Sequence, residues 1–403
     1  MNCKKSLSPV TLHYMVITGG FWMAFCVVTA YAAVYLQHLE YSNTEIGLIL
    51  ALGNVGGAVL SPVLGARIDR NRAVRHANVN YCLLAVQAAM LAVLRLNPVR
   101  NLLTTVVYIL FITVMMPVNA VNLDLDVRLE RANAPLNFGL ARSMGSFSFV
   151  ILSTLLGILT DRFSPLMLPF AGLAVTAIQL FGNRLIDRDL REAEAAMPEA
   201  SAAMGEKSSS LAAFVSKNRM FCLMLFGTII IFIAHNMDGN FLINEVTALG
   251  GDKTVMGYVA AFTAIVEVPV MMFVSKLPKK WKTVQYIRMS FVFFVLKILA
   301  YALAPTIPLF FAARVLQAPS YALYTVLIVG YANSVVDAKD SAKAQSLAFS
   351  MTTVGSVLAS LIGGVLFDNP ALGAKGTMLI AAAIAAAGAV IALAGTFERK
   401  AAG

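Results

Sequence analysis

The chain has 403 residues, of which 59% are hydrophobic and 13% charged, whereas soluble proteins have about 25% charged residues. So few charges cannot cover the surface of a soluble globule, and the composition therefore indicates a membrane protein. The net charge is +10, but the basic residues lie in short gaps between apolar segments, which argues against a nucleic-acid partner. The four cysteines are too widely spaced to indicate a disulfide framework or a zinc site.

A membrane-spanning helix needs about 20 mostly apolar residues. Twelve segments meet this requirement, and we predict spanning helices at residues 12–38, 44–66, 77–96, 102–123, 136–160, 164–183, 218–243, 254–275, 284–304, 307–331, 344–367 and 374–396. The only long hydrophilic stretch, residues 184–217, is predicted to be a cytoplasmic linker between two bundles of six helices, at residues 1–183 and 218–403. The chain is therefore expected to be an all-α membrane protein.

The distribution of lysine and arginine predicts the orientation of these helices. Basic residues are concentrated at both termini and in every second gap between apolar segments. Cytoplasmic loops of membrane proteins carry such an excess. We therefore predict that both termini are cytoplasmic, which agrees with an even number of helices.

The two halves of the chain share short sequence patterns. The fifth apolar segment ends in GILTD, residues 157–161, and the eleventh, its counterpart, ends in GVLFD, residues 364–368. Related halves are a common construction in transporters, whose substrate site lies near the middle of the membrane. The repeat therefore favours a transporter.

The loop after the second apolar segment reads GARIDRNRAVR, residues 65–75. A glycine, an aspartate four residues later, an arginine and further basic residues resemble the signature of the major facilitator superfamily. The matching residues are Gly65, Asp69, Arg70 and Arg75, although the usual glycine before the last basic pair is missing. The resemblance implies the major facilitator fold. It also implies that this loop is a cytoplasmic gate motif, which serves the conformational cycle rather than substrate binding.

Within that superfamily the chain most resembles the lactose permease, the related oligosaccharide:proton symporters and the phenylpropionate permeases. The stretch NFGLARSMGSFSF, residues 137–149, is similar to a helix-5 pattern of this group. The likeness implies that Arg142 binds the solute and that Phe149 stacks on a sugar ring. It places Asp124 where the group has an acidic partner of that arginine. It further implies a monomer in the cytoplasmic (inner) membrane of a bacterium.

The likeness continues in the second half of the chain. Asp238 matches one of two helix-7 aspartates of the group, and His235 replaces the other. Lys297 falls on a helix-9 arginine, and Arg314 falls on a helix-10 lysine. The resemblance thus implies functional roles for all four residues.

Two positions depart from the lactose permease. Gln317 and Ser320 stand where that protein has the helix-10 histidine and glutamate of its proton coupling. Its mechanism therefore cannot be carried over residue by residue. Glu267, in the eighth segment, lies about one turn from another acidic position of the group, and we interpret it as a possible replacement in the proton role.

The ionisable residues within or beside the spans are three acids and three bases: Asp124, Arg142, Asp238, Glu267, Lys297 and Arg314. A charge at bilayer depth costs about 3 kcal/mol on insertion scales, so it is normally retained only where it faces protein or water. Equal numbers of both signs allow the residues to neutralise one another in a bundle interior. Helical spacing also places Arg314, Gln317 and Tyr321 on one face of a helix.

We assign substrate binding to seven residues: Asp124, Arg142, Ser146, Phe149, His235, Gln317 and Tyr321. We assign proton coupling or charge balance to Asp238, Glu267, Lys297 and Arg314. A purely structural role is the alternative for each of these residues, as a counter-ion, a packing group or a partner of free backbone groups.

Together these features predict a secondary active transporter that works by alternating access in the lipid bilayer. Proton-coupled symport of a small polar organic solute, with a sugar or glycoside as its class, is the leading hypothesis. The alternatives are a proton-driven exporter of drugs or metabolites, a uniporter, and sodium coupling. The sequence contains no hydrolase, zinc-protease or phosphate-loop motif. We therefore do not expect an enzyme, a metal or an organic cofactor. We expect the proton to be the coupling ion.

Overall fold

The computed structural model describes residues 8–70, 75–132, 134–195, 210–274, 278 and 281–398. Within this part of the chain, twelve helices are long and apolar enough to cross a membrane. Each of them overlaps one of the predicted segments, from Pro9–Ala30 near the N-terminus to Gly373–Gly395. The prediction of an all-α protein with twelve spanning helices is confirmed.

By contacts between residues, the chain divides into two units. The first comprises Met1–Ala202 and Lys253–Ala264, and the second comprises Ala203–Asp252 and Ile265–Gly403. The units are therefore not two continuous halves, because the helix of residues 253–273 contributes to both. The bundle boundaries at residues 183 and 218 stay a prediction.

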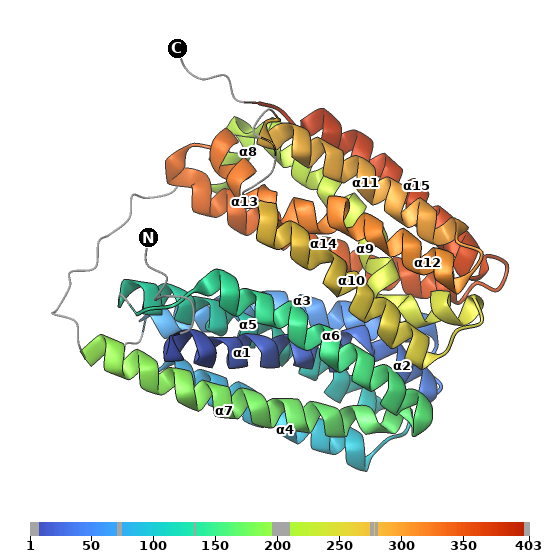
Figure 1. Ribbon diagram of the computed structural model, residues 1–403, viewed down its shortest axis with the longest axis horizontal. Helices are drawn as coiled ribbons and strands as arrows, with labels where there is room; N and C mark the ends of the chain where they lie inside the picture. Colours follow the sequence, from blue (N-terminus) through green and yellow to red (C-terminus); the bar gives the residue numbers. More distant parts are fainter. Residues whose placement is uncertain are drawn as a thin grey trace. The chain divides into compact units, whose positions relative to one another are not determined.

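The first unit is built from seven α-helices and the start of an eighth. Their bounds are α1 (Pro9–Phe25), α2 (Ala32–His38), α3 (Asn43–Arg70), α4 (His76–Leu96), α5 (Leu102–Arg131), α6 (Phe138–Arg162), α7 (Leu168–Ala195) and the first half of α10 (Lys253–Phe273). Helix α1 packs against α6 and α7, α4 packs against α5 and α7, and α3 packs against α5. Figure 1 shows α1 to α7 in blue to green and α10 in yellow.

The second unit contains the rest of α10 and seven further α-helices. Their bounds are α8 (Leu211–Lys217), α9 (Arg219–Ala248), α11 (Thr283–Leu303), α12 (Ile307–Arg314), α13 (Leu323–Val335), α14 (Ser341–Phe367) and α15 (Gly373–Gly395). Helix α9 packs against α14 and α15, and α11 packs against α13 and α15 (Figure 1). The aromatic core between them includes Phe221, Phe291, Phe294 and Tyr324, all nearly inaccessible.

Glycine allows two of these helix pairs to approach closely. A Cβ added at Gly57 of α3 would overlap the side chain of Met116 on α5. A Cβ at Gly227 of α9 would overlap the backbone of Ala392 on α15. In a bilayer, helices associate through packing and hydrogen bonds rather than through exclusion of water. Small residues at these crossings are therefore what lets the helices come together.

Helix α7 runs farther than the composition suggests. The sixth spanning segment is predicted to end at residue 183, whereas α7 continues to Ala195. Ile186 and Leu190 lie four residues apart, so they share a face of the helix, and both are buried against Tyr14 and Leu129 in a core cluster of the first unit. The predicted linker therefore begins as helix, because its few apolar residues have helical spacing.

The tenth spanning segment is interrupted in its middle. Between α12 and α13 the chain forms a 3₁₀ turn, Val315–Gln317, and then a π-helical turn, Ala318–Ala322. Pro319 lies in the second turn, and proline has no backbone N–H to donate to the preceding turn. Such turns inside helices are frequent at functional sites. The break lies where the sequence places its polar residues.

Candidate functional site

Asp238 and Arg314 form an ion pair in the interior of the second unit. The guanidinium donates to Asp238 Oδ2 from NH1 at 2.8 Å, and its NH2 lies 2.7 Å from Oδ1. The side chains are 6% and 2% exposed. Two parallel contacts between a planar guanidinium and a carboxylate are the strongest form of ion pair. The sequence assigned both residues to charge balance, and the structure brings them together.

Aromatic rings enclose the guanidinium of Arg314. Its Cζ lies 4.0 Å from the ring centre of Tyr301 on α11 and 4.3 Å from that of Phe310 on α12. A cation over an aromatic face is attracted by the electrons of the ring, more strongly when water is excluded. Arg314 is therefore held by one carboxylate and two rings, which fixes the direction of its charge.

Lys297 lies in a second chain of polar contacts in the same unit. The residue is fully buried. Its Nζ lies 3.0 Å from Nδ1 of His235 and donates to Oε1 of Gln317 at 2.9 Å. Gln317 in turn donates from Nε2 to Oε1 of Glu267 at 2.7 Å. Lys297 therefore faces protein rather than lipid, and four helical segments supply the chain: α9, α10, α11 and the turn after α12.

His235 is also part of an aromatic group. Its ring centre lies 4.7 Å from that of Tyr321, 5.6 Å from that of Phe232 and 5.7 Å from that of Phe294. Phe294 further lies 4.6 Å from the ammonium of Lys297. The predicted face of His235, Gln317 and Tyr321 thus combines hydrogen-bonding groups with ring faces. Such a surface can bind a solute that has both hydroxyl groups and an apolar ring face.

Glu245 joins the Asp238 pair, although it was not predicted. It is 4% exposed and lies on α9, seven residues after Asp238 and beyond a kink at Phe241, where the backbone is not helical. It interacts electrostatically with Asp238 and Arg314. The predicted seventh span ends at residue 243, which places Glu245 outside the membrane. The spacing of seven from Asp238, which would put both carboxylates on one face of an unbroken helix, is the sequence signal that could have identified it.

In the first unit, Arg142 stacks on an aromatic ring. Its Cζ lies 4.7 Å from the ring centre of Trp22 on α1. Gly145, one turn later on α6, leaves the space for this ring, because a Cβ there would overlap Trp22. Ser146 and Phe149 follow on α6 and are half-buried. The structure therefore places three of the predicted binding residues on one helix, beside a tryptophan that the sequence analysis did not single out.

Asp124 has partners other than those implied by the family likeness. The likeness places it beside Arg142, whereas in the structure it forms an ion pair with His76 of α4 and accepts from Arg128 Nε at 2.9 Å. Arg128 is four residues farther along α5, on the same face. These contacts fit the structural alternative for Asp124, namely that it stabilises the end of its helix.

Part of the predicted gate motif lies within the described residues. Arg75 precedes α4, and its NH2 lies 3.0 Å from Oδ1 of Asp187 on α7, which also pairs with Arg191. Gly65 is on α3, where no described atom lies within 4 Å of an added Cβ. Asp69 and Arg70 end α3, but their side chains lie outside the described residues. The motif thus connects the end of α7 with the start of α4.

The interior of the first unit also contains a group of amides that the sequence analysis did not single out. Asn80 on α4 donates to Asn122 on α5 at 2.9 Å and to Asn183 on α7 at 3.4 Å. Asn183 donates to the carbonyl of Ala77 at 3.0 Å. Tyr14 of α1 donates to the carbonyl of Asn122 at 2.8 Å. Four helices are therefore linked by neutral hydrogen bonds.

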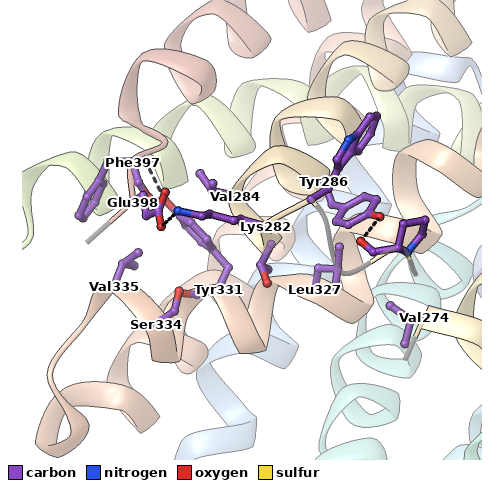
Figure 2. A pocket seen from close by; sticks show the side chains of 13 residues that line it. Val274, Lys282, Val284, Tyr286, Leu327, Tyr331, Ser334, Val335, Phe397 and Glu398 are labelled. Carbon is purple, nitrogen blue, oxygen red and sulfur yellow. Dashed lines mark hydrogen bonds and ion pairs between the residues drawn. The ribbon is translucent and has the colours of Figure 1, made fainter. Parts of the chain in front are cut away.

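A pocket of about 500 Å³ lies in the second unit, at the start of α11 and the end of α13. Figure 2 shows Lys282 and Glu398 meeting at this pocket, where Nζ lies 2.6 Å from Oε1. Tyr331 donates to the carbonyl of Phe397 at 3.0 Å and so fixes the chain after α15. None of the residues that line the pocket belongs to the charged contacts of Lys297 or Arg314. In the described part of the chain, no three His, Cys, Asp or Glu side chains are placed to hold a metal ion.

Comparison with known proteins gives a family and a fold. The MFS_1 like family matches residues 14–374, whereas no curated protein matches the sequence. The solved structure of the nucleoside transporter NupG has a TM-score of 0.77 at 14% identity, over 96% of this chain and 98% of that chain. A bacterial homologue of the iron transporter ferroportin, in an inward-facing state, has a TM-score of 0.69 at 14% identity, over 98% and 100%.

A third similar structure is a bacterial homologue of the human lysosomal transporter Spinster, in an inward-facing and occupied conformation. Its TM-score is 0.68 at 13% identity, over 96% of this chain and 97% of that chain. At such identities the likeness shows the fold. The family and these proteins are transporters, not enzymes, as predicted. The chain belongs to the MFS_1 like family and has the twelve-helix fold of major facilitator transporters.

Proposed function

We propose that this protein is a proton-coupled symporter of a small polar organic solute, and that the solute is a sugar or glycoside. The observation that carries the proposal is the chain of contacts from His235 through Lys297 and Gln317 to Glu267, next to the Asp238–Arg314 pair. Burying these charges is expensive, and charges inside a membrane protein typically mark ion pathways or proton relays.

The same contacts suggest how a proton is coupled to the solute. Gln317 is assigned to the solute, and it connects Lys297 with Glu267 through hydrogen bonds of 2.9 and 2.7 Å. A solute hydroxyl that takes over one of these hydrogen bonds changes the surroundings of the other two groups. The proton affinity of a carboxylate depends on nearby cations and hydrogen bonds. Solute binding and the proton affinity of the acids beside Lys297 and Arg314 are therefore linked in the proposed mechanism, which is alternating access.

Side chains of both units support the proposed solute class. Tyr321 stacks beside His235 in the second unit, and Trp22 stacks beside Arg142 in the first. Ring faces next to hydrogen-bond donors suit a hydroxylated ring. The resemblance to the lactose permease group points to the same class. A nucleoside, the solute named for the structurally similar NupG, is itself an N-glycoside and falls within this proposal.

The location and assembly are also proposals. The excess of basic residues at both termini and in alternate gaps supports cytoplasmic termini. We further propose a monomer in the inner membrane of a bacterium, from the likeness to the lactose permease group. Accessibility of single cysteines introduced at residue 209 or 399 to a membrane-impermeant thiol reagent in intact cells tests the orientation. Labelling without permeabilisation contradicts cytoplasmic termini.

The decisive experiment for the function is uptake of labelled solutes by cells that express the protein. The panel contains mono- and disaccharides, nucleosides and aromatic acids, each with and without a protonophore, and cells with an empty vector are the control. Accumulation of one class that collapses with the protonophore supports the proposal and identifies the solute. Uptake that stops at equal solute concentrations on both sides of the membrane and is unaffected by the protonophore indicates a uniporter. Uptake that depends on sodium instead indicates sodium coupling. Absence of uptake of every class contradicts import and favours the exporter.

A further inference from the structure

Glu245 is a buried acid beside an ion pair whose charges already balance. It is 4% exposed, and its Oε1 has no hydrogen-bond partner among the described residues. It lies three residues before the end of α9 at Ala248, and Asp238 lies seven residues farther from that end, on the other side of a kink at Phe241. Glu245 therefore lies between the Asp238–Arg314 pair and one end of the helix.

Three charged or titratable groups interact electrostatically with Glu245. They are Asp238 on α9 itself, Tyr301 on α11 and Arg314 on α12. Among these groups Arg314 supplies the positive charge, and both of its terminal nitrogens are already engaged with the carboxylate of Asp238. Glu245 thus shares its nearest cation with a carboxylate that holds it more closely.

Counting charges over the whole cluster gives an excess of one negative charge. The acids are Asp238, Glu245 and Glu267, all counted as ionised, and the bases are Lys297 and Arg314. His235 is counted as neutral, because its Nδ1 lies 3.0 Å from Nζ of Lys297, where a second cation would be repelled. An unpaired charge in the interior is strongly unfavourable, and a buried group avoids it by changing its protonation state. One bound proton makes the cluster neutral.

The geometry decides where this proton binds. Asp238 is held as a carboxylate by the two contacts from Arg314. A proton on His235 would place a second cation 3.0 Å from Lys297. Glu267 accepts a hydrogen bond from Gln317 and is only half-buried. Glu245 is the acid that is buried beside another carboxylate, where like charges raise the cost of ionisation.

We propose that Glu245 binds the proton that makes this cluster neutral, and that it releases this proton when Arg314 moves from Asp238 toward Glu245. In the release step the carboxylic acid gives one proton to water and becomes a carboxylate, which pairs with Arg314. No electron is transferred, and no other bond is broken. The protonated state itself follows from the packing of the second unit. The role of this proton as the coupling ion rests on the proton-coupled transport proposed above.

Infrared spectroscopy of the full chain in phosphatidylethanolamine and phosphatidylglycerol liposomes tests the protonated state directly. The wild-type protein is expected to show the C=O absorption of a buried carboxylic acid at pH 7, shifted by exchange into heavy water. Glu245→Gln removes this absorption. Glu45→Gln is the matched control, because Glu45 begins α3 on the surface and pairs with Arg100. An absorption that is equally strong in Glu245→Gln overturns the proposal.

A second variant tests the exchange of Arg314 between the two acids, and it leaves Glu245 in place. In Asp238→Asn the guanidinium has no carboxylate partner other than Glu245 among the groups that face it. Glu245 is then expected to ionise and to lose its C=O absorption at pH 7. Persistence of the C=O absorption in Asp238→Asn contradicts the movement of Arg314 from Asp238 to Glu245. This test remains valid even if Glu245→Gln does not fold.

Transport separates this inference from the proposed function. In Glu245→Gln, protonophore-sensitive accumulation of the solute identified by the uptake panel is expected to be lost, while equilibration of the same solute remains. Full proton-driven accumulation by this variant overturns the role of Glu245 and leaves the symporter proposal standing. The opposite outcome is also distinguishable. If the carboxylic-acid absorption depends on Glu245 but the wild-type protein shows no protonophore-sensitive uptake, the proton site stands and the symporter proposal fails.

Discussion

The most deeply buried polar side chains of the two units differ in their chemistry. In the first unit, Asn80, Asn122 and Asn183 join helices through neutral amide contacts. In the second, Lys297 and Arg314 bring full charges to positions that are 0% and 2% exposed. Amides cost little to bury once they are hydrogen-bonded, whereas charges carry a large desolvation cost even when paired. The amides therefore suit a structural role, and the charges suit a group that changes state during the transport cycle.

The strongest test of this contrast is Arg314→Met. The variant keeps a side chain of similar length but leaves Asp238 and Glu245 without their cation. Removal of one partner from a buried ion pair typically costs about 3–5 kcal/mol of stability. We expect a large decrease in the unfolding temperature of the purified protein in detergent, together with loss of transport.

Lys282→Met is the matched control for this experiment. Lys282 pairs with Glu398 at 2.6 Å, but both side chains are more than half exposed. Exposed pairs contribute about 0–1 kcal/mol, so this variant is expected to unfold close to the wild-type temperature. Equal decreases for both variants would show that burial does not distinguish the two pairs.

Arg142→Lys tests whether the first unit also has a charge with a role in transport. Lysine keeps the charge but lacks the planar guanidinium that lies over Trp22 and can bind a solute with two parallel hydrogen bonds. We expect uptake to decrease about ten-fold or more, which corresponds to about 1.4 kcal/mol of lost interaction. The measurement is initial uptake at a solute concentration below saturation.

Arg188→Lys is the control for Arg142, because Arg188 pairs with Glu192 on α7 and both side chains are exposed. It is expected to retain uptake. Normal uptake by Arg142→Lys would remove Arg142 from the solute site.

Lys297→Ala sharpens the comparison within the second unit. The loss of this ammonium leaves the hydrogen bond to Gln317 unmade and gives the cluster a further uncompensated negative charge. We expect most transport to be lost, and part of it to return in the double variant with Glu267→Gln, which restores the charge balance. The readout is uptake at equal amounts of protein in the membrane.

The double variant of Lys297→Ala with Glu45→Gln is the control for this rescue. It removes an acid from the surface of the first unit, so it is not expected to restore transport. Absence of rescue by Glu267→Gln, or equal rescue by both acids, would mean that Lys297 and Glu267 do not share a charge balance.

Asn80→Ala should have the smallest effect on transport. It leaves the buried Oδ1 of Asn122 without the hydrogen bond from Asn80, which costs about 1–3 kcal/mol. The expected result is a lower unfolding temperature with uptake retained. Asn97→Ala, which removes an exposed contact with Asn101, is the control. Loss of uptake without loss of stability would show that the amides of the first unit have a role in transport as well.

Part of the candidate site is readable in the sequence because charges are rare in apolar segments. Lys297, Asp238 and Arg314 are conspicuous for this reason alone, and all three prove to be buried and paired. The sequence analysis did not identify Glu245 because the predicted seventh span ended at residue 243. The sequence analysis also did not predict the partners of Asp124, because a position in a family pattern does not determine the direction of a side chain.

Other features depend on residues far apart in the chain. Helix α7 continues past the predicted end because Ile186 and Leu190 find a buried surface beside Tyr14. The turns after α12 follow from Pro319, whose position the sequence gives. Which groups the break brings together, such as Gln317 with both Lys297 and Glu267, depends on three other helices.

The sequence by itself determined that this protein has twelve apolar helices, because the thickness of the bilayer sets the length of every span. It also determined that a few charges lie within them, because a charge is visible against an apolar background. Only the tertiary structure decided which charges meet. Pairing depends on side chains that lie far apart in the chain, such as Asp238 and Arg314 at a separation of 76 residues, and on their packing rather than on any local pattern.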